Sequence, residues 1–102
     1  MERLEKLKAL LIANPADSFV EHAIALECIK LGNDVDARKH FENILKREPG
    51  YIGSYYHLGK LLERTGETEL AISWYEKGMD EAKKAGEQHA FGELKGAWEE
   101  VS

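Results

Sequence analysis

The sequence repeats itself at an interval of 34 residues, and this period limits what the chain can fold into. The recurring pairs are Pro15 and Pro49, Ile24-Ala25 and Leu58-Gly59, Gly32 and Gly66, Ala37 and Ala71, and Phe41 and Tyr75. Between the prolines and glycines, apolar residues recur at the three- and four-residue spacing of a helix face. A period of this length predicts helix–turn–helix units that bury their apolar faces against one another.

Six helical segments separated by short turns fit this pattern. They are residues 2–13, a segment from about 18 that closes at Gly32-Asn33, and residues 35–47, 52–64, 68–84 and 87–101. The turns contain proline or glycine, which end helices. Asp17 or Ser18 is expected to cap the second segment, and Ser18 with Glu21 matches a capping box. Asp34 and Thr68 are expected to cap the third and fifth segments.

Composition places the chain among folded globular proteins. It has 102 residues, enough for one domain, with 43% hydrophobic and 32% charged residues. The net charge of −5 disfavours binding to nucleic acid or to an anionic membrane surface. Cys28 has no second cysteine to pair with, which favours a reducing compartment. The charged start, Met1 to Lys6, lacks a signal peptide's apolar core, and no apolar run is long enough to span a membrane. We therefore expect a cytoplasmic protein.

Six small, aromatic or leucine residues of the second repeat occupy positions that one repeat family uses to pack its helices together. These residues are Tyr55, Leu58, Gly59, Leu62, Ala71 and Tyr75. On them the chain resembles the tetratricopeptide repeat family. Gly59 and Ala71 are expected at close helix–helix contacts, with the aromatics filling the space beyond. The first repeat matches less well, because Glu21 stands where an aromatic is usual and Cys28 where tyrosine is usual.

The resemblance implies an all-α, right-handed α-α superhelix of helical hairpins in a single domain. Its parts would be a half-repeat helix at 1–15, repeats at 17–50 and 51–84, and a capping helix at 87–101. The register of this last helix is blurred by Gly86, just before it, and by Gly92 and Gly96 within it.

The resemblance also implies a concave groove, lined by the first helix of each repeat, that binds a peptide or helix of a partner protein. Carried over by position, the groove residues are Phe19, His22, Leu26, Ile29, Lys30, Tyr56, His57, Lys60 and Arg64, with Phe91, Leu94 and Trp98 as possible additions. Lys60 and Arg64 lie one helical turn apart, which suggests recognition of an acidic or carboxylate-bearing segment. Alternatively, Leu26 and Ile29 simply pack against neighbours and the two bases are solvated.

No residue pattern indicates catalysis. None of the four histidines stands in a zinc-like motif, and no glycine-rich phosphate loop is present. Cys28 reads as a small buried hydrophobe without a base to activate it. The sequence therefore predicts neither an enzyme nor a metal or cofactor site.

Self-association is the alternative function. The end helices carry the apolar stripes Leu4-Leu7-Leu11 and Phe91-Leu94-Trp98-Val101. The second stripe is expected to cap the preceding helix by burying Trp98, with acids on its opposite side. A monomer is therefore favoured over a homodimer.

Overall fold

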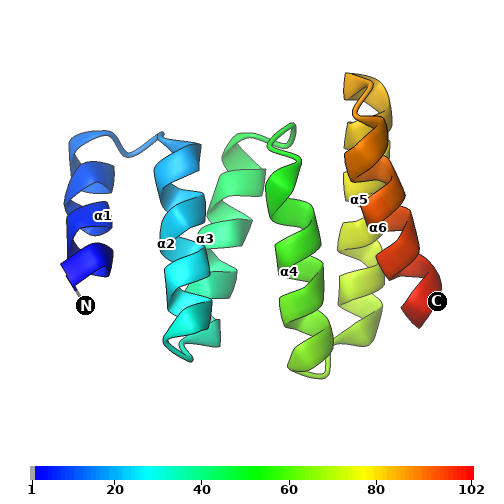
Figure 1. Ribbon diagram of the computed structural model, residues 1–102, viewed down its shortest axis with the longest axis horizontal. Coiled ribbons are helices and arrows are strands. Elements are labelled where there is room, and N and C mark those ends of the chain that lie inside the picture. Colours follow the sequence, from blue (N-terminus) through cyan, green and yellow to red (C-terminus); the bar gives the residue numbers. More distant parts are fainter. Residues whose placement is uncertain (1) are drawn as a thin grey trace. The chain divides into compact units, whose positions relative to one another are not determined.

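The computed structural model describes residues 2–102, with side chains from Arg3 onward, and these residues form six α-helices and no strand (Figure 1). The helices are α1 (Glu2–Ala13), α2 (Ser18–Lys30), α3 (Asp34–Arg47), α4 (Gly53–Arg64), α5 (Thr68–Ala85) and α6 (Gln88–Val101). The all-α fold and the expected helix bounds are confirmed to within one or two residues. Met1, part of the half-repeat expected at 1–15, lies outside the described residues.

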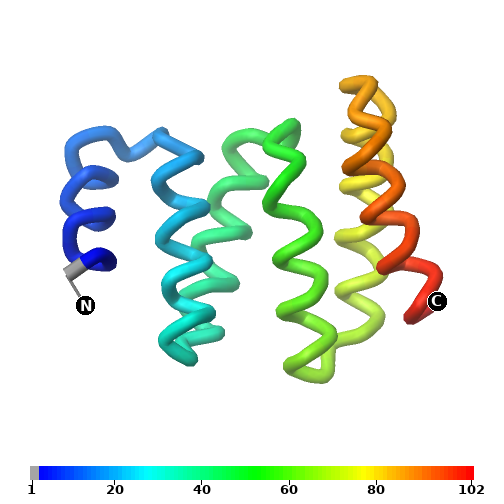
Figure 2. The backbone as a smooth tube through the Cα atoms, viewed as in Figure 1, coloured from blue at the N-terminus to red at the C-terminus, as the bar shows by residue number. Residues whose placement is uncertain are grey.

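The helices group into two compact units, the first ending at Glu48 and the second beginning at Pro49. In the first unit α1 packs on α2, and α2 packs on α3. In the second, α5 packs against both α4 and α6, while α4 meets α6 over a smaller area. The backbone trace shows consecutive helices within each unit running antiparallel (Figure 2). Each unit is thus built from helical hairpins, as the repeat predicts.

The glycines predicted to end helices are confirmed, but the predicted N-caps Asp34 and Thr68 are wrong. Gly86, for example, follows α5 with φ at +71°, a conformation that favours glycine. Asp17 caps α2 by accepting a 3.1 Å hydrogen bond from the Val20 N–H, and Ser18 and Glu21 form no capping box. Asn33, not Asp34, caps α3 through its side-chain oxygen.

The fifth helix begins at Thr68 but is not capped by it. The residue that precedes the helix is Glu67, which makes no side-chain capping bond. The prediction that Thr68 caps α5 is therefore wrong.

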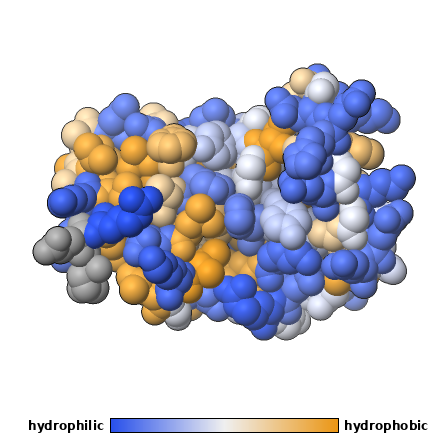
Figure 3. Space-filling view, viewed as in Figure 1, coloured by the Kyte–Doolittle hydropathy of each residue, from blue (hydrophilic) through white to orange (hydrophobic). Residues whose placement is uncertain are grey.

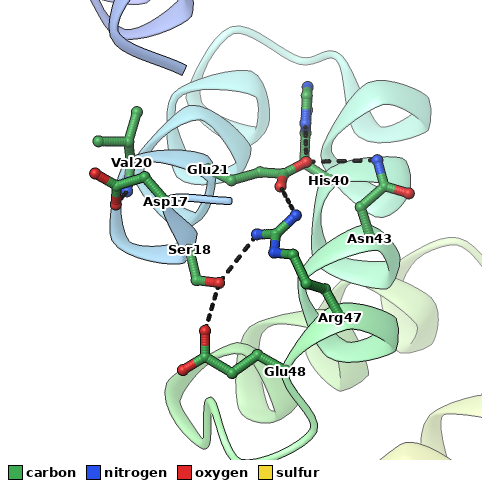
Figure 4. Close-up of polar contacts among 8 residues, drawn as sticks. All are labelled: Asp17, Ser18, Val20, Glu21, His40, Asn43, Arg47 and Glu48. Carbon is green, nitrogen blue, oxygen red and sulfur yellow. Dashed lines mark hydrogen bonds and ion pairs between the residues drawn. The ribbon is translucent and has the colours of Figure 1, made fainter. Parts of the chain in front are cut away.

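Ser18 and Glu21 are instead part of a polar network that joins α2 to α3 (Figure 4). Glu21 is only 3% exposed, and its carboxylate lies 3.0 Å from Arg47 Nη1 and 2.9 Å from His40 Nδ1. The Ser18 hydroxyl accepts a hydrogen bond from Arg47 and donates one to the carboxylate of Glu48. Among the described residues no buried side-chain polar atom lacks a partner. Glu21 therefore occupies its interior position because α3 supplies the charge and the donors that a buried carboxylate needs.

Gly59 lies directly against α5. A Cβ on Gly59 would lie 2.1 Å from Cε1 of the fully buried Tyr75 ring. The expected close approach at Gly59 is confirmed, and Ala71 is also completely buried. The Tyr75 hydroxyl donates to Glu63, and burial raises the pKa of that hydroxyl, so it remains protonated.

Gly78 provides a second close contact, which the sequence did not single out. A Cβ there would lie 2.7 Å from Cβ of Tyr55 and 3.0 Å from Cδ1 of Leu94. Leu94 and Ala97 are the buried residues of α6, whereas Trp98 is only half-buried and donates its indole N–H to Glu76 at 3.0 Å. The helix packs on α5 as expected, but through Leu94 and Ala97 rather than through a buried tryptophan.

Candidate functional site

A groove runs between α4 and α6 in the second unit. It consists of two adjoining cavities of about 470 and 260 Å³ that share Tyr56 and Glu93. The larger is lined by Ile52, Gly53, Tyr56, His57, Glu87, Ala90, Glu93 and Leu94, and the smaller by Tyr56, Lys60, Gly92, Glu93, Gly96, Ala97 and Glu100. We call this the α4–α6 groove. It exists because both helices pack chiefly on α5 and meet each other over a smaller area.

Three of the four predicted site residues of α4 line the groove. Tyr56, His57 and Lys60 are half-buried there, and the rings of Tyr56 and His57 meet edge to face at 5.8 Å. Arg64 is exposed in the last turn of α4 and does not line either cavity. The expectation that Lys60 and Arg64 act together therefore loses its geometric support.

Lys60 is already engaged by acidic side chains. Its Nζ lies 3.5 Å from Glu100 on α6 and 3.9 Å from Glu63, and 5.7 Å from the centroid of the Tyr56 ring. The hypothesis of an acidic partner required Lys60 to be available for pairing with that partner, and within the chain it already pairs with Glu100 and Glu63. With Glu87 and Glu93 also lining the groove, acids outnumber bases on its walls.

His57 contributes a neutral ring to the groove. Burial lowers the pKa of its imidazole, and the nearby Glu93 carboxylate opposes this only in part. The ring is therefore neutral at neutral pH, with one nitrogen that donates and one that accepts a hydrogen bond.

Of the three residues suggested from α6, only Leu94 lines the groove. Phe91 lines a separate cavity of about 400 Å³ at the turn between α5 and α6. Trp98 is held toward α5 by its bond to Glu76. Sequence reasoning missed the contribution of Gly92, Gly96 and the α6 acids, although two glycines four residues apart inside a predicted helix were visible.

The predicted site residues of the first unit form a stripe along α2. Phe19, His22, Leu26 and Ile29 recur every three or four residues, so they share one face of the helix. Phe19 is 75% exposed and Leu26 is 36% exposed, whereas His22 and Ile29 are half-buried. The rings of His22 and the buried Phe41 pack edge to face, with their centroids 5.5 Å apart. Lys30 is exposed at the end of the helix. The stripe is therefore partly packed and partly open.

Exposed apolar side chains gather on the first unit. The large hydrophobic residues of the described chain that are exposed are Leu10, Ile12, Phe19, Leu26, Leu31 and Val35. All precede Glu48, and orange hydrophobic residues are concentrated over α1 and α2 in the space-filling view (Figure 3).

The surroundings of the other residues considered for catalysis or metal binding do not favour either role. Cys28 is 2% exposed, and burial raises the pKa of its thiol, which disfavours a reactive thiolate. Within the described part of the chain, no three His, Cys, Asp or Glu side chains are grouped to hold a metal ion. None of the described helices combines the length and the apolar character needed to cross a bilayer.

Comparisons with known proteins agree with the geometry of the hairpins. Residues 52–85 match the tetratricopeptide repeat family. A crystal structure of a tetratricopeptide repeat domain protein from Salinibacter ruber is 39% identical, with a TM-score of 0.80 over 83% of this chain and 94% of that one. A solution NMR structure of such a protein from the same organism is 38% identical, with a TM-score of 0.84 over 87% and 90%.

A crystal structure of MamA protein shares the fold at 19% identity, with a TM-score of 0.74 over 82% of this chain and 46% of that one. No curated protein matches the sequence. The long alignment with the Salinibacter ruber domain, together with the match over α4 and α5, establishes that this chain belongs to the tetratricopeptide repeat family.

Proposed function

We propose that this protein is an interaction module that binds a peptide or helix of a partner protein. Tetratricopeptide repeat domains generally mediate protein–protein interactions, and repeat proteins use concave surfaces for this purpose. The observation that carries the proposal is the α4–α6 groove, in which Tyr56, His57 and Lys60 stand at the positions expected for partner contact. The exposed stripe of α2, with Phe19 and Leu26, is the corresponding surface of the first unit.

The proposal assigns no reaction and no cofactor to the chain. A cytoplasmic location and a monomeric state are part of it, because the single cysteine is free and buried and α6 covers α5. The net charge of −5 argues against nucleic acid or an anionic membrane as the partner.

The test compares the proteins captured by the purified wild-type chain with those captured by a groove variant. Tyr56→Ala/Lys60→Ala removes the aromatic and basic wall of the groove and leaves every fully buried residue of α4 in place. We expect the specific partner to be lost. Circular dichroism and a urea titration establish that the variant is folded.

Trp74→Ala/Lys77→Ala is the matched control. It also removes one aromatic and one lysine, which stack on each other at 4.6 Å on α5 rather than in the groove. Partners retained by this control and lost from the groove variant would support the proposal. Equal retention by both variants would show that partners bind elsewhere.

Self-association remains a second candidate because of the exposed apolar residues of the first unit. Ile12 is 80% exposed and Phe19 is 75% exposed, and such side chains often mark an interface when they cluster. Sedimentation at increasing concentration distinguishes the two functions. A dimer that dissociates in the variant Ile12→Ser/Phe19→Ser would favour self-association, whereas a monomer at every concentration would favour the partner-binding module.

A further inference from the structure

We propose that the α4–α6 groove binds a basic α-helix of a partner protein, with lysine or arginine side chains directed at the acids of α6. This inference rests on the proposed function and adds the chemical class of the partner. Three features support it: the shape of the groove, the glycines in one wall and the charges along that wall.

No close contact with another described residue requires a glycine at either position in α6, Gly92 or Gly96. A Cβ on Gly92 or Gly96 would meet nothing within 4 Å, in contrast to Gly59 and Gly78, whose neighbours leave no room. Glycine inside a helix weakens it relative to alanine, so these two positions make α6 less stable without improving its contacts. Both line the smaller cavity, one turn apart on the same face. A wall made of bare backbone lets another backbone approach closely.

The charges along the groove complement a basic ligand. Glu93 and Glu100 are seven residues apart and therefore lie on one side of α6, and Glu87 stands at the other end of the groove. Lys60 is the one lysine or arginine that lines the two cavities, and Glu100 and Glu63 already pair with it. Residues 49–102 carry ten acids and six bases, whereas the preceding residues carry nine and eight. Acidic potential is thus concentrated in the unit that contains the groove.

The spacing of the acids favours a helix as the occupant. Glu93 and Glu100 repeat after two helical turns, which matches lysines at positions i and i+7 of a helix lying along α6. Tyr56 and Ala90, which line the groove and are half-buried, contribute apolar surface beside them. A helix could place small apolar residues against Gly92 and Gly96 and basic residues next to the acids. It would then match both the shape and the charge of the groove.

The test titrates the isotope-labelled full chain with two synthetic peptides and follows backbone amide NMR signals. Both peptides are about 16 residues long, enough for appreciable helicity, and share one face of alanine and leucine. One carries lysines beside that face, and its twin carries glutamates. We expect shifts at Tyr56, Gly92 and Gly96, and at least about tenfold tighter binding of the lysine peptide.

Three variants distinguish the contribution of charge to peptide binding from the contribution of the groove's shape. Glu93→Gln/Glu100→Gln should reduce the preference for lysine to within about twofold. Glu69→Gln/Glu99→Gln, which removes two exposed acids that do not line the groove, should leave it unchanged. Gly96→Leu should block both peptides while keeping or raising the unfolding temperature, which a merely structural glycine would not allow.

Each outcome has a distinct meaning. Equal or tighter binding of the glutamate peptide at the same amides would overturn the basic-helix inference and leave the groove as the binding site. No shift from either peptide at millimolar concentration would overturn both the inference and the groove. Shifts at Gly92 and Gly96 that appear on concentrating the chain alone would assign the groove to a second copy and overturn the proposed partner.

Discussion

At the scale of single residues, glycines decide how closely the helices of the second unit approach. Gly59→Ala would place a methyl group within van der Waals contact distance of the Tyr75 ring, which is completely buried. We expect a loss of roughly 1–3 kcal/mol in unfolding free energy, because overpacking outweighs the better helix propensity of alanine. Urea denaturation measures it.

Gly96→Ala is the control for this substitution. The added methyl meets nothing within 4 Å, so we expect the unfolding free energy to rise by up to about 1 kcal/mol. If both variants were equally stable, the conclusion that Gly59 lies in a tight contact would be wrong.

His57 gives the second unit a pH dependence with a definite sign. Because burial lowers the pKa of its imidazole in the folded state, the unfolded chain binds the proton more readily. The free energy of unfolding is therefore unaffected by His57 above the ordinary pKa of 6.5. It decreases as the pH falls below that value, because the unfolded chain then takes up a proton that the folded chain does not. The variant His57→Gln should therefore lose less stability than the wild type between about pH 7 and pH 5.

His89→Gln serves as the control, because it removes an exposed histidine of α6. The measurement is the unfolding free energy from urea titrations at several pH values. A pH dependence that is unaltered by His57→Gln would place the responsible group elsewhere.

At the scale of elements, the polar network holds α2 to α3 through a buried charge. Arg47→Met leaves the carboxylate of Glu21 without its main counter-charge. We expect a loss of about 2 kcal/mol, below the range for a fully buried pair because Arg47 is one-third exposed. The double variant Glu21→Met/Arg47→Met should be more stable than Arg47→Met alone. A double variant that loses the sum of both single effects would show that the pair is not coupled.

Local signals in the sequence placed the helices but not all of their capping residues. Proline and glycine mark the turns whatever the rest of the fold does. The choice between Asp17 and Ser18 as a cap, however, depends on Arg47 and Glu48, which lie about 30 residues away. The acid at Glu21, in a slot where an aromatic is usual, was a visible sign of this network, but its partners were not.

Of the two helices that form the candidate site, only α4 contributes residues that could be predicted from the sequence. The register of the repeat placed Tyr56, His57 and Lys60 along α4. Glu100, which pairs with Lys60, is 40 residues further along the chain and belongs to the helix with the least regular repeat pattern. The charge of the groove therefore emerges only when α6 is packed.

At the scale of the whole molecule, α6 is the cover of α5. Leu94 is 1% exposed and Ala97 is 5% exposed, and deletion from Glu87 onward would uncover the surface around Gly78. We expect the truncated chain to lose several kcal/mol of stability and to aggregate, since buried apolar area contributes about 25 cal/mol per Å². Urea titration and light scattering test this.

The full-length variant Leu94→Ala separates packing from truncation itself. It should lose roughly 2–4 kcal/mol through the same contact. A truncated chain that is as stable and as monomeric as the wild type would identify α6 as a displaceable segment rather than a cover.

The break before Pro49 also divides the chromophores of the protein. Both tryptophans and all four tyrosines follow it, so the first unit absorbs and emits in the near ultraviolet only through phenylalanine. Fluorescence during heating therefore reports the second unit alone, while far-ultraviolet circular dichroism reports the helices of both. Coincident transitions would mean that the two units melt together, and separated transitions that each melts by itself.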